Sequence, residues 1–105
     1  METDPTKIPL DTRSLPLRRL AQFNHRSTGL HLEVHSTEPA FQFYTGKYID
    51  VPSIDGRSAQ TEGFGFCVEP SRYVNAINEP EWRNMVLLKK GQVFGCYNVY
   101  KAWTE

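Results

Sequence analysis

The stretch LHLEVH, at residues 30–35, carries the clearest structural signal in the chain. Three apolar side chains alternate with three polar ones: Leu30, Leu32 and Val34 with His31, Glu33 and His35. Alternation with a period of two is the pattern of a β-strand that buries one face. The stretch therefore predicts a strand, which Thr37, Glu38 and Pro39 then interrupt.

Further strands are expected on both sides of this one. A weakly patterned strand is predicted over residues 18–23, and aromatic or β-branched runs predict others over 41–45, 64–69 and 93–103. Pro70 should close the strand at 64–69 because proline has no N–H for the ladder. Leu87–Leu88 and Val93–Phe94 flank a turn and suggest a hairpin.

The fold class follows from these segments. Residues 75–82 are rich in turn formers and are expected to hold one short helical turn, and residues 47–63 form a long loop. No segment has a convincing helical period. We predict an all-β fold of antiparallel strands with long loops, in which residues 1–16 are an irregular lead-in and residues 17–105 form the domain.

Composition and charge restrict the possible partners. The 105 residues are 39% hydrophobic and 23% charged, with twelve basic and twelve acidic side chains. A nucleic-acid binder of this size usually carries a basic excess, so neither nucleic acid nor an anionic membrane surface is expected as a partner. The N-terminus has no apolar stretch typical of a secretory signal, and Cys67 and Cys96 are expected as small core residues with free thiols. We therefore expect a cytoplasmic location.

Two constellations suggest sugar chemistry, each with a plainer interpretation. Glu69 ends a strand of small and apolar residues, a setting that suits a general base, although most glutamates are simply exposed. Gln42 and Tyr44 share one strand face, where an amide can bridge hydroxyl groups and a ring can cover a C–H surface. A polar outer face of an antiparallel sheet is the alternative for that pair.

A metal site is weakly suggested and not expected. His31, Glu33 and His35 share a strand face and are ligand types that zinc uses. A solvated strand face is the better interpretation because no further ligand has suitable spacing. The sequence also contains no phosphate loop, nucleophile elbow or HExxH motif.

The ordered set of segments resembles a known family. Residues 32–46, LEVHSTEPAFQFYTG, resemble the pattern LEVxTTEPxxQFYTGN of the aldose 1-epimerase (galactose mutarotase) family. Residues 65–69, GFCVE, are similar to its GFCLE, and residues 73–78, YVNAIN, resemble its PDAIN segment. Residues 86–92, VLLKKGQ, resemble its LLRPGE. The order and spacing agree from about residue 17 to residue 103.

The resemblance implies a fold and a reaction. The fold would be part of a β-supersandwich, and the reaction would interconvert the α and β anomers of a hexose such as galactose or glucose. Position by position, Glu69 matches the general base, Gln42 the substrate-binding glutamine and Tyr44 the neighbouring aromatic. The family needs no metal or organic cofactor, so the implied partner is a monosaccharide.

The resemblance covers only the C-terminal portion of the family's domain. The family's acid histidine, sugar-clasping arginine and aspartate lie upstream and have no matched position, and Glu69-Pro70-Ser71 stands where the family has ETQ. We therefore expect the isolated chain to be inactive and to associate with itself through open sheet edges. A non-catalytic remnant that binds carbohydrate or another protein is the alternative. The related hexose-6-phosphate epimerases are less favoured because no extra arginine lies near Gln42.

Overall fold

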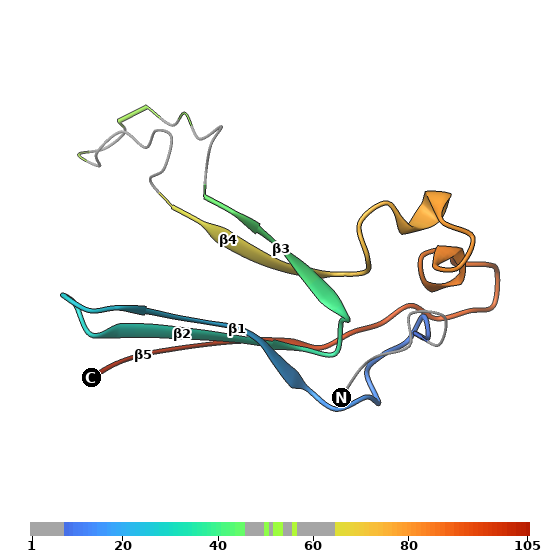
Figure 1. Ribbon diagram of the computed structural model, residues 1–105, viewed down its shortest axis with the longest axis horizontal. Coiled ribbons are helices and arrows are strands. Elements are labelled where there is room, and N and C mark those ends of the chain that lie inside the picture. The colour runs from blue at the N-terminus through green and yellow to red at the C-terminus, as the bar shows by residue number, and fades with distance from the viewer. Residues whose placement is uncertain (1–7, 46–49, 51, 54–55, 57–64) are drawn as a thin grey trace.

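The computed structural model of the chain describes residues 8–45, 50, 52–53, 56 and 65–105. It contains two antiparallel sheets (Figure 1). The larger has the order β1-β2-β5, from β1 (Arg18–His25), β2 (Leu30–Ser36) and β5 (Asn98–Thr104). The smaller pairs β3 (Ala40–Tyr44) with β4 (Cys67–Ser71). The predicted all-β class is confirmed.

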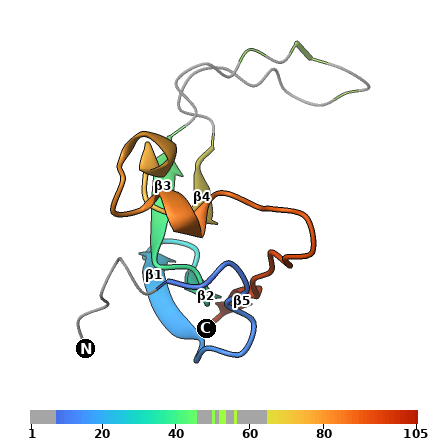
Figure 2. The same cartoon turned by 90° about the vertical axis from the view of Figure 1, so that its right-hand side faces the viewer.

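The two sheets form two layers. Figure 2 shows β3 and β4 on one side of the molecule and β1, β2 and β5 on the other. Two short 3₁₀ turns, η2 (Ala76–Asn78) and η3 (Arg83–Met85), lie at one end of this arrangement (Figure 1). Neither these turns nor any other helical segment in the described part of the chain has the length and hydropathy needed to cross a membrane.

Strand β2 forms the centre of the larger sheet, as its alternating pattern predicts. It pairs with β1 on one side and β5 on the other, and a bulge at Leu20 shifts the register with β1. Val34 is completely buried, whereas Leu30, at the other end of the strand, is 47% exposed. The sheet is thus covered at one end and open at the other.

Aromatic packing joins the two layers. The Phe23 ring of β1 lies 5.6 Å from the Phe43 ring of β3 and 5.2 Å from the Phe66 ring, measured between centroids. The Tyr100 hydroxyl of β5 donates a 2.7 Å hydrogen bond to the carbonyl oxygen of Val68 in β4. Aromatic pairs at these separations stabilise a fold beyond their buried area. These contacts set the position of the β3–β4 pair above the larger sheet.

A second apolar cluster forms around the 3₁₀ turns. Ile8, Ala76 and Met85 are buried there, and Tyr73 and Trp82 pack against them. Met85, at the end of η3, is completely buried. Trp82 is half-buried and covers this cluster.

A buried ion pair ties the chain segments around the smaller sheet. The Arg72 Nε donates to Glu38 Oε2 at 2.9 Å, and the two side chains are 6% and 3% exposed. The remaining nitrogens of the guanidinium donate to the carbonyl oxygens of Pro9 and Leu10, at 2.5 and 2.8 Å. The segment at residues 37–39, which the sequence predicts only as a strand interruption, thus contributes Glu38 to a buried polar cluster.

Three sequence expectations for the strands are corrected. β4 continues through Pro70 to Ser71, because Pro70 lies opposite Phe41 in a ladder that uses only one side of the strand among the described residues. The hairpin around residues 87–94 is absent, and β5 begins only at Asn98. Most of the predicted loop at 47–63 lies outside the described residues, as does Phe64.

Candidate active site

The smaller sheet brings together the residues that the sequence suggests for sugar chemistry. Gln42 of β3 lies directly opposite Glu69 of β4, and Tyr44 lies opposite Cys67. Side chains two residues apart in a strand point to the same face, and directly opposite residues are cross-strand neighbours. These four side chains therefore share one face, which we call the polar face.

Hydrogen bonds fix the polar face along each strand. The Tyr44 hydroxyl donates to Gln42 Oε1 at 2.5 Å. The Cys67 thiol donates to Glu69 Oε1 at 3.3 Å. Because Gln42 accepts through its oxygen, its NH₂ group keeps two donors for other partners. The face thus offers an amide donor beside a carboxylate acceptor.

The polar face is open to solvent. Tyr44 is 51% exposed, Cys67 and Glu69 are also exposed, and Gln42 is half-buried. The opposite face of the same strands packs Phe43 against Phe23. This arrangement presents the four polar side chains outward and leaves them accessible to a sugar.

Cys67 corrects an expectation. It is exposed and not a core residue, because the β4 alternation places it on the same side as Glu69. The pKa of the Cys67 thiol is raised, chiefly by its hydrogen bond to Glu69. Cys96 is half-buried, and burial is the main cause that raises its pKa.

The three histidines have partners away from the polar face. His31 stacks on Trp103 of the edge strand with 5.1 Å between ring centroids, and its Nε2 lies 3.1 Å from a Glu105 carboxylate oxygen. The Nε2 of His35 lies 3.0 Å from Glu33 Oε1. His25 hydrogen-bonds within its own turn. The resemblance leaves the acid histidine unmatched, and the described contacts bring none of these to Glu69.

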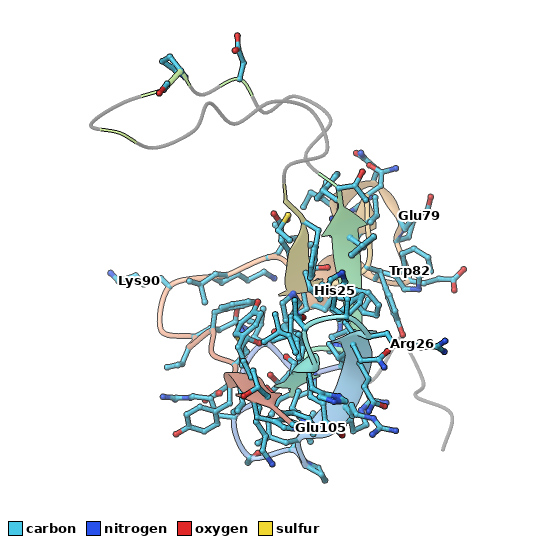
Figure 3. All side chains as sticks on the ribbon, turned by 90° about the vertical axis from the view of Figure 1, so that its left-hand side faces the viewer. His25, Arg26, Glu79, Trp82, Lys90 and Glu105 are labelled. Atoms are coloured by element: carbon cyan, nitrogen blue, oxygen red, sulfur yellow. The ribbon has the colours of Figure 1, made fainter. Side chains whose placement is uncertain are left out.

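The set His31, Glu33 and His35 does not converge on a metal position. In the part of the chain that the structure describes, no three His, Cys, Asp or Glu side chains are grouped to hold a metal ion. Glu33 is instead engaged by His35 and Arg19, and hydrogen bonding to His35 is the main cause that lowers its pKa. Lys89 and Lys90 are exposed, and Lys90 projects away from the strands (Figure 3).

The sequence of the chain is similar to those of known proteins. A family model described as aldose 1-epimerase matches residues 5–101. The bifunctional protein gal10 of Schizosaccharomyces pombe is 36% identical over 105 residues, 100% of this chain and 14% of that protein. The bifunctional protein GAL10 of Kluyveromyces lactis is 42% identical over 86 residues, 82% of this chain and 12% of that protein.

A shorter relative gives a similar alignment. The galactose mutarotase of Sus scrofa is 36% identical over 84 residues, which is 78% of this chain and 24% of that protein. This chain therefore spans between 12% and 24% of the length of these three relatives.

Proposed function

Because the chain belongs to the aldose 1-epimerase family, we propose that it contributes the general base and neighbouring sugar-binding residues to a site that interconverts hexose anomers. The substrate class is an aldohexose such as galactose or glucose. The observation that supports this most is the pairing of Gln42 with Glu69 across the β3–β4 ladder. Two residues that the family resemblance assigns separately thereby become cross-strand neighbours on an accessible face.

Each side chain has a distinct role in the proposed reaction. Glu69 accepts the proton of the anomeric hydroxyl, and Gln42 donates from its amide to a sugar hydroxyl. The ring of Tyr44 covers a C–H face of the sugar. Protonation of the ring oxygen opens the ring, the C1–C2 bond rotates, and closure gives the other anomer. The family chemistry implies no metal or organic cofactor.

The isolated chain is expected to give no mutarotation above the buffer rate. Each proton-transfer group contributes about 10²–10⁴-fold, and the resemblance supplies a base without its acid. The measurement is polarimetry of freshly dissolved α-D-glucose at increasing protein concentration. An acceleration that scales with concentration and survives repurification would contradict this expectation.

A non-catalytic role in carbohydrate binding is the second candidate, favoured by the exposure of Tyr44 and Glu69. Titration of D-galactose or D-glucose into the chain, followed by NMR, distinguishes a binder from an inert fold. Shifts confined to the polar face together with an unchanged polarimetric rate would support binding alone.

We also propose a cytoplasmic location, which the two free cysteines support.

Self-association of the chain is expected from its surface. The described residues bury only five apolar side chains, Ile8, Val34, Val68, Ala76 and Met85. A cavity of about 460 Å³ beside the aromatic cluster is lined by apolar groups of Phe23, Leu30 and Phe66. Both β1 and β5 are sheet edges among the described strands. Open edges and apolar patches promote association.

Light scattering of the purified chain should therefore show oligomers. Leu30→Lys places a charge at the apolar cavity and should shift the distribution toward smaller species. Val74→Lys is the matched control, because Val74 is 64% exposed and lies outside that cavity. A monodisperse wild-type monomer with a cooperative melt would refute self-association.

A further inference from the structure

The polar face contains one further residue, Cys67, to which the proposed reaction gives no role. Cys67 is the first residue of β4, two residues before Glu69 and opposite Tyr44. Its exposed side chain makes no contribution to the core. Its hydrogen bond is to Glu69 Oε1.

On each of the two strands, a functional side chain accepts a hydrogen bond from the side chain two residues away. On β3, the Tyr44 hydroxyl donates to the side-chain oxygen of Gln42, and on β4, the Cys67 thiol donates to one of the two carboxylate oxygens of Glu69. In each pair, the holding residue lies two positions further from the Ala40–Ser71 end of the ladder. A free exposed glutamate samples many rotamers, and holding it in one of them reduces the entropy lost on reaching a reactive geometry.

We propose that Cys67 is a positioning residue for Glu69, which fixes Oε1 through its thiol and leaves Oε2 free to accept the anomeric proton. This inference rests on the proposed function, because it refines the same site. A neutral and weak donor suits the task, since it orients the carboxylate without a competing positive charge. The raised pKa of Cys67 is consistent with a thiol that stays protonated and donates.

The first test measures the hydrogen bond in the chain itself. Cys96→Ser leaves Cys67 as the reporting thiol, and its alkylation by iodoacetamide is followed by mass spectrometry across a pH series. We expect Cys67 to react more slowly near neutral pH than in concentrated guanidinium chloride. Glu69→Gln should accelerate the reaction several-fold because it removes the negative charge that the thiol faces.

The matched control reports on the other thiol. In Cys67→Ser, the alkylation of Cys96 should be unchanged by Glu69→Gln, because Cys96 responds to burial and to Glu38. An alkylation profile of Cys67 that is the same in native and denatured chain would overturn the proposal. So would a profile that Glu69→Gln leaves unchanged.

The second test separates positioning from a purely structural role. Cys67→Ala removes the donor, whereas Cys67→Ser keeps one, so the two variants are compared in the Sus scrofa galactose mutarotase with its aligned stretch replaced by this chain's. The kcat should fall several-fold in the first with little change in KM, and it should be retained in the second. A Cys67→Ala chimera with the parent kcat would overturn positioning. A parent chimera without activity would contradict the proposed function, and the thiol profile alone would then decide the role of Cys67.

Discussion

Replacing Arg72 with alanine is expected to lower the free energy of unfolding by about 3–5 kcal/mol, because it leaves the Glu38 carboxylate buried without its partner. The Glu38 side chain is 3% exposed, and Arg72 also donates to the carbonyl oxygens of Pro9 and Leu10. Natural domains are stable by only about 5–15 kcal/mol, so this loss is a large fraction of the total. Urea denaturation followed by tryptophan fluorescence measures it.

Two further variants make the Arg72 experiment decisive. Arg13→Ala removes an ion pair with Asp11 whose side chains are 50% and 37% exposed, and it should change the midpoint little. The double variant Arg72→Met with Glu38→Gln removes both charges and should recover much of the loss. An Arg72→Ala chain with the wild-type urea midpoint would show that the pair contributes nothing to stability.

The Arg72–Glu38 pair also matters for the site. Glu38 lies two residues before the first residue of β3, and Arg72 directly follows the last residue of β4. The pair therefore holds the Ala40–Ser71 end of the ladder that places Gln42 opposite Glu69. A slip of one residue in that ladder would move one of the two side chains to the apolar face.

The central strands could be predicted from the sequence because their patterns match their environment. The alternation at residues 30–35 corresponds to β2, in which Val34 is buried and the polar side chains of this stretch are half-buried. The aromatic run at 41–45 corresponds to β3, displaced by one residue. Local alternation was sufficient where one face of a strand is buried.

The hairpin expected near residue 90 does not form, because the apolar residues of this segment contact residues far away in the sequence. Met85 is drawn into the cluster with Ile8 and Ala76, far away in sequence. The Phe94 ring lies 4.7 Å from the Arg72 guanidinium carbon. Val93 and Phe94 stay exposed, so neither forms the buried face that a hairpin needs. These contacts are long-range and leave no periodic pattern in the sequence.

The candidate site could be predicted only in parts. Family resemblance suggested Gln42 and Glu69, but their pairing depends on the register of two strands separated by a long loop. The residue type alone predicts a buried Cys67 because cysteine is usually apolar and buried, whereas the β4 alternation places it beside Glu69. For Cys67, the strand pattern is a better predictor than the residue type.

Glu69→Gln should reduce kcat by about 10²–10⁴-fold in a restored enzyme, equivalent to about 3–5 kcal/mol of transition-state free energy. Glutamine keeps the size and hydrogen-bonding capacity of the side chain but cannot take the anomeric proton. KM should change much less, because the lost interaction belongs to the transition state. A suitable vehicle is the Sus scrofa galactose mutarotase with its aligned stretch replaced by this chain's.

Gln42→Ala in the same chimera is the matched control on the opposite strand. It removes one neutral hydrogen bond to the sugar, so it should cost about 1–2 kcal/mol and act mainly through KM. Polarimetry with D-galactose at several concentrations separates kcat from KM for both variants. Since Gln42 and Glu69 are cross-strand neighbours, a general disturbance of the ladder would affect the two variants alike. A Glu69→Gln chimera that kept more than a tenth of the parent kcat would mean that Glu69 is not the base.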